Sequence, residues 1–227
     1  MTAAALVCGS CGTGLPSNSK FCNECGGAVA SAATPAEYKQ VTVLFADVVH
    51  SMDIAAAVGP ERLREIMADL VDRCAAVVQQ YGGTLDKFTG DGVMAVFGAP
   101  VALEDHAIRA CLAALGIQTG ARELADEVHR SDGIDLLLRV GLNSGQVVAG
   151  EIGSGFKGYT AIVGQQVGLA QRMESVAPPG GVMLSASTSA FPARPGIAGD
   201  ADKVSRFFFC RNPFLCDYRS PILAAPN

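Results

Sequence analysis

Two apolar segments of this chain lead into an aspartate, and that pattern constrains the fold more than any other feature. Residues 41–46 precede Asp47, and residues 85–97 carry Asp91 between two short apolar runs. A carboxylate directly after a buried strand lies at the edge of the sheet, within reach of a ligand. Two of them on neighbouring strands suit hard divalent cations and phosphoryl chemistry assisted by two metals. Alternatively, both are turn residues, because Asp-Gly favours hairpins.

The composition bounds the class of protein. The 227 residues are 49% hydrophobic and 17% charged, which is typical of a globular domain with a small appendage. A net charge of -5 gives no field that attracts polyanions, so we expect no nucleic-acid partner. No apolar run approaches the ~18 residues that would span a bilayer, and no signal peptide is recognisable. We therefore expect a cytoplasmic location with reduced thiols.

Half of the eight cysteines gather near the N-terminus in two Cys-x-x-Cys pairs. They are Cys8, Cys11, Cys22 and Cys25. Paired units of this kind predict a structural zinc site, because four thiolates fill a tetrahedral shell and leave no open position for catalysis. Gly9, Gly12 and Gly26 permit the positive φ that such turns need. A redox dithiol pair or two disulfides remain the alternatives.

The cysteine module, residues 1–30, and a linker at 31–37 precede the main domain. Residues 1–36 contain only Lys20 and Glu24 as charged side chains. A tetrathiolate zinc site adds negative charge, so DNA binding by this module is disfavoured. Contact with a regulatory protein is the more plausible role.

Hydrophobic periodicity predicts a main domain at 38–190. Strands are expected at 41–46, 84–88, 93–97, 136–143, 146–150 and 182–184, and helices at 60–81, about 104–128 and 167–176. The order β-α-β-β-α-β, with additions, indicates an α+β fold of ferredoxin-like type with an antiparallel sheet. Residues 191–227 have many prolines and no clear period, so we expect an atypical tail, with disorder as one interpretation.

Several motifs of this domain resemble class III nucleotidyl cyclase catalytic domains, in the style of the actinobacterial branch that often carries zinc knuckles. The motifs are residues 44–49 (LFADVV), 86–98 (DKFTGDGVMAVFG), 138–145 (LRVGLNSG), and 158–162 (GYTAI) leading to 170–173 (AQRM). They occur in the family's order and span about 150 of the 227 residues. Four ordered motifs are far more specific than any one of them alone.

The resemblance implies roles for individual residues. Asp47 and Asp91 fall where the family binds two Mg²⁺ or Mn²⁺ ions, and the backbone carbonyl of Val48 falls where it supplies a further ligand. Lys87 matches the lysine that selects adenine, which favours ATP over GTP. Thr160 matches a second purine-reading residue, although it precedes Gly164 by four residues where the family typically has three.

Two arginines complete the implied site. Arg172 matches the arginine that stabilises the transition state, and Gly168 stands where the family places a partner asparagine. Arg139 falls where it can contact the triphosphate, or it is simply a partly exposed strand arginine. In the family one subunit supplies the metal aspartates and its partner the purine-reading and arginine groups, so the resemblance implies a homodimer with composite sites.

The resemblance leaves two functions open. The first is an adenylate cyclase that converts ATP to cyclic AMP and pyrophosphate. The second is a weak or inactive cyclase-like module that binds nucleotide or a protein partner, which Gly168, the spacing before Gly164 and the atypical tail support. A guanylyl cyclase is disfavoured by Lys87.

Overall fold

The structure is a computed structural model that describes residues 6–16, 19–27, 37–151, 160–190 and 207–210. Near the N-terminus, β1 (Leu6–Val7) and β2 (Gly14–Leu15) form a two-stranded antiparallel sheet within the cysteine module. The predicted linker lies almost entirely outside the described residues.

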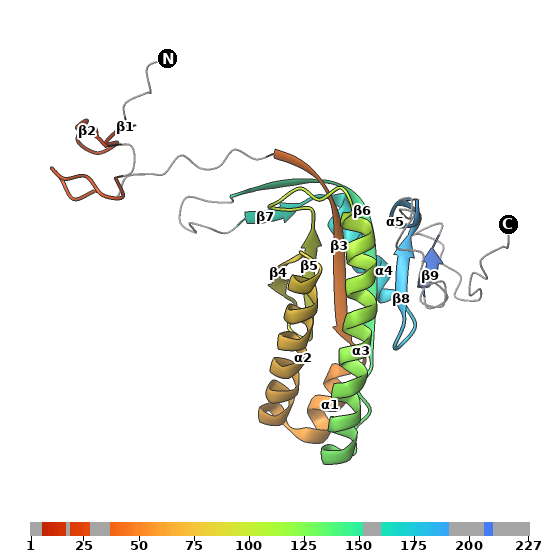
Figure 1. The fold of residues 1–227 in the computed structure, drawn as a ribbon. Helices are drawn as coiled ribbons and strands as arrows, with labels where there is room; N and C mark the ends of the chain where they lie inside the picture. Colours follow the sequence, from red (N-terminus) through yellow and green to blue (C-terminus); the bar gives the residue numbers. More distant parts are fainter. Residues whose placement is uncertain (1–5, 17–18, 28–36, 152–159, 191–206, 211–227) are drawn as a thin grey trace.

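The main domain is built on one twisted sheet (Figure 1). Its strands are β3 (Glu37–Val48), β4 (Thr84–Phe88), β5 (Gly92–Phe97), β6 (Leu138–Glu151), β7 (Thr160–Val163), β8 (Val182–Ser185) and β9 (Phe207–Cys210), in the order β4-β5-β3-β6-β8-β9 with β7 also paired to β6. The predicted α+β fold is confirmed. Pairing is antiparallel from β4 through β6 and β7, as predicted, but β8 runs parallel to β6 and β9 parallel to β8. The complete sheet is therefore mixed.

Among the described residues, five helices accompany this sheet. They are α1 (Ser51–Val58), α2 (Pro60–Gln80), α3 (His106–Asp132), α4 (Gln165–Ser175) and α5 (Ala186–Ser189). The three predicted helices are present, and Pro60 begins α2 as its position suggested. The sequence did not predict α1, because Ile54 is its one buried side chain and leaves no readable period.

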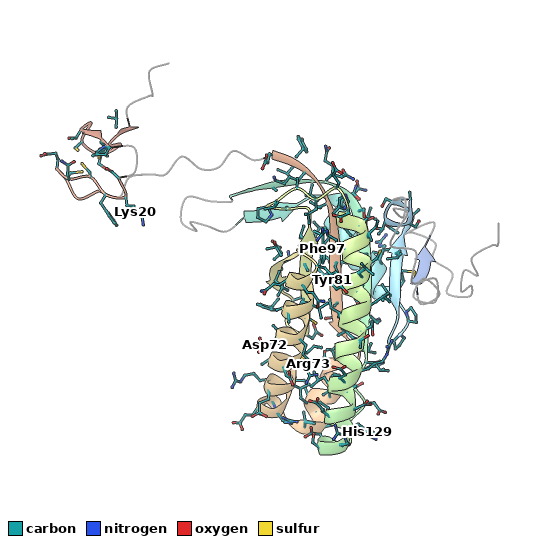
Figure 2. All side chains as sticks on the ribbon, in the orientation of Figure 1. Lys20, Asp72, Arg73, Tyr81, Phe97 and His129 are labelled. Atoms are coloured by element: carbon teal, nitrogen blue, oxygen red, sulfur yellow. The ribbon has the colours of Figure 1, made fainter. Side chains whose placement is uncertain are left out.

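Helices cover both faces of the central strands. On β3, Leu44, Ala46 and Val48 pack under α2 and α3, while Val41, Val43 and Phe45 pack on the opposite face with Ala170 of α4. This alternation follows from the two-residue side-chain period of a strand. Phe97 is fully buried on the face under α2 and α3, and Tyr81 packs against the same cluster (Figure 2).

The structure corrects the prediction of two short strands at 136–143 and 146–150. One continuous strand, β6, occupies this region, and Gly145 does not interrupt it. The glycines instead make room for α4: a Cβ on Gly141 would collide with the backbone of Glu174, and one on Gly145 with the side chain of Gln166. α4 therefore packs closely over a strand that carries glycine at both crossing points.

The tail also differs from expectation. Residues 207–210 form β9, which extends the sheet beyond β8 with Val182 opposite Phe207. No strand period is recognisable in this segment, because a four-residue apolar run carries too few residues to show one. The other residues of the predicted tail, 191–206 and 211–227, lie outside the described residues.

The packing of α4 on β6 leads to a stability prediction. Gly141→Ala should lower the free energy of unfolding by at least about 1–3 kcal/mol, because the new methyl group meets helix backbone that cannot turn aside. Gly120→Ala in α3 is the matched control, since its Cβ would approach only Arg73 at 3.9 Å. That change should stabilise the helix by about 0.5–1 kcal/mol. Urea denaturation of both variants would measure this, and equal effects would contradict the packing.

Candidate active site

Asp47 lies at the end of β3, on the α4 face of the sheet. It continues the alternation of Val43 and Phe45, whose side chains pack on that face. Asp47 is opposite Gly92 of β5, and the N–H of Val48 donates to the carbonyl of Asp91 at 3.1 Å. A Cβ at Gly92 would collide with Asp47 Oδ1, so glycine is required for the carboxylate to sit here. The strand end and the hairpin turn are thus joined.

Asp91 lies in the turn between β4 and β5 and is held by α1. The hydroxyl of Ser51, the first residue of α1, donates to Asp91 Oδ2 at 2.6 Å. This bond to the charged form holds the pKa of Asp91 below its usual range. His50 precedes α1 in the left-handed conformation, with φ 56°, and is exposed. The unpredicted helix α1 therefore has a role in orienting the second carboxylate.

The two carboxyl groups interact directly. Burial, followed by the charges of Asp91 and Glu174, raises the pKa of Asp47 to about 7. Asp47 Oδ1 is buried without a hydrogen-bond partner among the described residues. A buried oxygen that lacks a donor beside a second carboxylate fits a divalent cation, whose charge replaces the missing donor. The residues present therefore fit the predicted metal site.

An ion pair next to Asp47 involves one predicted residue and one that sequence reasoning missed. Arg139 lies opposite Asp47 on β6, and its Nε is 3.3 Å from Glu174 Oε1 of α4, without hydrogen-bond alignment. Arg139 Nη1 also donates to the carbonyl of Ser175 at 3.3 Å. Burial raises the pKa of Glu174, whose side chain is 8% exposed. Arg139 thus faces α4 in this structure.

Glu174 left a signal in the sequence that could have been read. It follows Met173 and lies four residues after Ala170 on the buried stripe of α4. An acid on an apolar stripe needs a partner, since burying an unpaired charge is costly. Only the sheet register shows that the partner is Arg139 and that Asp47 is adjacent.

Lys87 is exposed on β4, where a β-bulge decides which face it occupies. Leu85 pairs with Ala95 and Lys87 pairs with Met94, so Asp86 is an extra residue. Met94 belongs to the α4 face, and Lys87 therefore shares that face with Asp47. Regular pairing would have turned Lys87 toward the face covered by α2 and α3 instead.

The remaining predicted residues lie on β7 and α4. Thr160 begins β7 opposite Glu151, and β7 pairs with β6 without a register shift. The side chain of Thr160 lies outside the described part of the structure. Arg172 and Gly168 are exposed on α4, while Ala170 and Met173 are buried. Within one chain, the structure thus brings Asp47, Asp91 and Arg139 together and places Arg172 and Lys87 on exposed positions.

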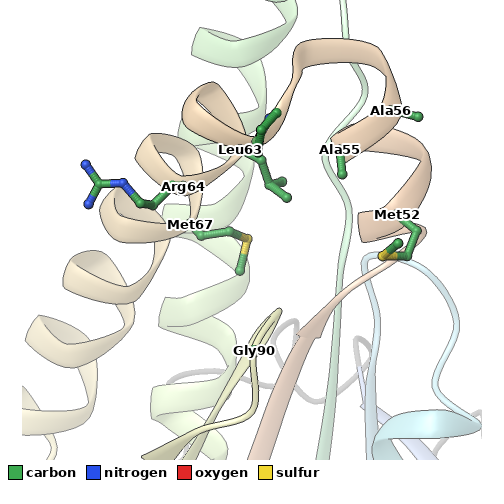
Figure 3. Close-up of a pocket in the computed structure, with 8 residues that line it drawn as sticks. Met52, Ala55, Ala56, Leu63, Arg64, Met67 and Gly90 are labelled. Carbon is green, nitrogen blue, oxygen red and sulfur yellow. The ribbon is translucent and has the colours of Figure 1, made fainter.

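A pocket of about 520 Å³ lies beside the hairpin turn, between α1 and α2 (Figure 3). Met52 and Ala55 of α1, Leu63 and Met67 of α2, and Gly90 of the turn line it. Gly90 is the residue before Asp91, so the pocket borders the candidate site. Its lining is almost wholly apolar, with Arg64 as its one charged residue.

The four N-terminal cysteines converge as predicted. Their sulfur atoms all lie within 4.8 Å of one another, with Cys8 Sγ 3.6 Å from Cys25 Sγ and Cys11 Sγ 3.5 Å from Cys22 Sγ. These separations are too long for disulfides and close to the edge of about 3.8 Å expected for four sulfurs around zinc. The sequence predicted positive φ at three glycines beside these cysteines. Gly12 and Gly26 adopt it, whereas Gly9 does not.

The raised pKa of Asp47 predicts a pH-dependent stability in metal-free protein. Between the ordinary value of 3.8 and about 7, the folded state binds the proton that the unfolded state has lost, so stability falls as pH rises through this window. Asp47→Asn removes this contribution, so its stability relative to the wild type should increase as the pH rises from about 4 to about 7. Urea denaturation in a chelator would measure the difference, and a pH-independent difference would contradict it.

The cysteine cluster predicts about one zinc ion per chain in protein purified under reducing conditions. Cys11→Ser should lose the zinc because it removes one of four ligands. Cys111→Ser, on α3 and outside the cluster, is the control and should retain it. Metal analysis would decide the matter, and equal zinc in both variants would contradict the site.

The chain was compared with known proteins. Residues 33–203 match the family described as the adenylate and guanylate cyclase catalytic domain. The guanylate cyclase soluble subunit beta-2 of Rattus norvegicus is 33% identical over 149 residues, which is 66% of this chain and 21% of that protein. Adenylate cyclase 1 of Rhizobium meliloti is 30% identical, over 61% of this chain and 21% of that protein. The chain thus spans about a fifth of the length of these relatives.

Solved structures agree with this match. The guanylyl cyclase Cya2 superposes with a TM-score of 0.67 at 31% identity, covering 71% of this chain and 82% of that one. The adenylyl cyclase CyaB from P. aeruginosa gives 0.64 at 28% identity, covering 70% and 82%. Among the described helices, none has the length and apolarity to cross a membrane. The chain belongs to the class III adenylyl and guanylyl cyclase catalytic domain family.

Proposed function

We propose that this chain is an adenylate cyclase that converts ATP to 3′,5′-cyclic AMP and pyrophosphate for intracellular signalling in the cytoplasm. The observation that carries the proposal is the interacting pair Asp47 and Asp91, with Asp47 Oδ1 buried and unpartnered. Family membership supports cyclase chemistry. Adenylyl and guanylyl cyclases are about equally similar to the chain, so the choice of ATP rests on Lys87.

The proposed reaction forms one bond and breaks another. The ribose 3′-oxygen attacks the α-phosphorus in line, the bond from that phosphorus to the bridging oxygen breaks, and pyrophosphate leaves. Two Mg²⁺ or Mn²⁺ ions, when bound, supply charge neutralisation and lower the pKa of the 3′-hydroxyl. Asp47, Asp91 and the Val48 carbonyl would hold them. Arg172, whose planar guanidinium suits two-point phosphate contact, would stabilise the charge that develops.

Lys87 would select the base. Its ammonium donates to N1 of adenine, whereas guanine carries a proton at that position and suits an acid. The bulge at Asp86 supports this role, because it turns Lys87 to the face that carries Asp47. Thr160 would accept from the adenine amino group. Arg139 would contact the triphosphate only after leaving Glu174, so we assign it first to holding α4 against β6.

A homodimer would complete the site. Arg172 and Lys87 lie on exposed positions, where a partner subunit could reach them. A head-to-tail dimer would place the Lys87, Thr160 and Arg172 groups of one chain against Asp47 and Asp91 of its partner. The cysteine module would hold structural zinc and offer a surface for a regulatory protein.

The alternative is a catalytically weak module that binds nucleotide or a protein partner. Gly168 favours it, since loss of one oriented donor typically costs about 2.7–4 kcal/mol of transition-state stabilisation. A Cβ at Gly168 would meet nothing within 4 Å, so a side chain fits there without repacking. The missing donor can therefore be restored experimentally.

The deciding assay scores cyclic AMP and cyclic GMP formed by purified protein with Mn²⁺. We expect cyclic AMP from ATP, little cyclic GMP from GTP, and background product from Asp91→Ala. Gly168→Asn should raise the rate, by up to about 10²-fold, if the partner amide is what this chain lacks. If the wild type formed no more cyclic nucleotide than Asp91→Ala, the alternative of a non-catalytic binding module would be favoured.

Mixing two inactive variants tests the composite site. Asp47→Ala retains the Arg172 half and Arg172→Ala retains the metal half, so a mixed dimer contains one intact site. Equal mixing at random should restore about a quarter of all sites. The measurement is cyclic AMP formation after the subunits have exchanged, with each variant alone as control. No recovery despite exchange would contradict the head-to-tail arrangement.

A further inference from the structure

A buried side-chain amide joins three elements beside the candidate site. Asn143 of β6 is 1% exposed. The hydroxyl of Ser187 in α5 donates to Asn143 Oδ1 at 2.9 Å. Asn143 Nδ2 donates to the backbone carbonyl of Gln166 at 3.0 Å and to its side-chain Oε1 at 2.7 Å, both in the first turn of α4. One amide therefore connects β6, α5 and α4.

The orientation of this amide is fixed by its partners. A backbone carbonyl can only accept, so the group that faces Gln166 must be the NH₂ of Asn143. The oxygen is left to accept from Ser187. Both ends of a fully buried amide are then satisfied, and loss of either contact would leave a costly unpaired polar group.

The α5 end of the connection is itself anchored. Ser185 caps α5 by accepting from the N–H of Thr188 at 3.3 Å, and Ser144 Oγ donates to Thr188 Oγ1 at 3.1 Å. The chain of hydroxyls continues from Ser144 to Thr42 at 2.7 Å and from Thr42 to His106 Nδ1 at 2.7 Å. α5 is thus tied to the middle of the sheet and to the start of α3.

The α4 end leads to the residues that would read the nucleotide. Gln166 lies two positions after Gly164, which joins β7 to α4. That continuous unit carries Thr160 at one end and Arg172 at the other. Gly145 leaves the space that the Gln166 side chain occupies, since a Cβ there would collide with it. Asn143 therefore holds the middle of the unit that carries both groups.

We propose that Asn143 is a positioning residue, which holds the β7–α4 unit and with it Thr160 and Arg172 in place against the sheet. The inference deepens the proposed function and rests on it for its catalytic consequence. In the described part of the chain, the side-chain hydrogen bonds of Asn143 reach Gln166 and Ser187, whereas Asp47 and Asp91 are fixed by β3, β5 and Ser51. Its loss should therefore damage the nucleotide-reading half of the site and spare the metal half.

Hydrogen exchange tests the positioning without any enzymatic activity. Asn143→Asp preserves size and the acceptor for Ser187, but it removes both donors and places a negative charge against the two oxygens of Gln166. We expect amide exchange at residues 169–172 to accelerate about tenfold, with β3 unchanged. Ser189→Ala in α5, whose hydroxyl donates to the carbonyl of Ala186 in the same helix, is the control and should leave exchange unchanged.

A second variant tests the same contact in case Asn143→Asp does not fold. Gln166→Ala removes the Oε1 acceptor but retains the backbone carbonyl, so it should give a smaller acceleration at the same amides. If neither folded variant alters exchange at 169–172, or if β3 is accelerated equally, the positioning role is wrong.

Complementation tests the catalytic consequence. Asn143→Asp mixed with Asp47→Ala should recover activity in about a quarter of the sites. In each mixed dimer, one site combines Asp47 and Asp91 of the Asn143→Asp chain with Arg172 of the Asp47→Ala chain, and that site is intact. Mixed with Arg172→Ala, it should recover none. Recovery with Arg172→Ala instead would overturn the proposal. If Asp47→Ala and Arg172→Ala themselves fail to complement, the composite site is at fault, and exchange at 169–172 still decides the role of Asn143.

Discussion

The close approach of Asp47 and Asp91 is the constraint on which the rest of the structure depends. Burial raises the pKa of Asp47 to about 7, and repulsion from the neighbouring carboxylate of Asp91 adds to the effect. The fold supports this arrangement at several points. Gly92 makes space for it, Ser51 donates to Asp91, and the backbone of Val48 joins the strand to the turn. Several contacts thus hold together two carboxylates that repel each other. A bound cation would neutralise this repulsion and explain why the fold maintains the pair.

The two faces of the sheet have separate tasks. One face, under α2 and α3, carries the main apolar core. The other carries Asp47, Arg139 and α4, and the bulge at Asp86 adds Lys87 to it. The candidate chemistry is therefore concentrated on the face that α4 covers. A second subunit would have access to this face in the proposed dimer.

Much of the fold and half of the site could be predicted from the sequence. Long periodic segments such as α2, and the strand-end acids Asp47 and Asp91, are local features that a single stretch of chain specifies. The missed features depend on pairing between distant segments. Lys87 changes face because β4 has one more residue than β5 opposite it, and Gly145 continues a strand because α4 packs over it. The partners of Glu174 and Asn143 are recognisable only once α4 lies on β6.

The most direct test of the central claim is to locate the cation. Crystals grown with Mn²⁺ and a non-reactive ATP analogue would show manganese by anomalous scattering. The account predicts manganese between the carboxylates of Asp47 and Asp91, in contact with the analogue's phosphates and lost in Asp47→Asn. Bound analogue with no manganese at this pair, or with manganese held elsewhere, would contradict it.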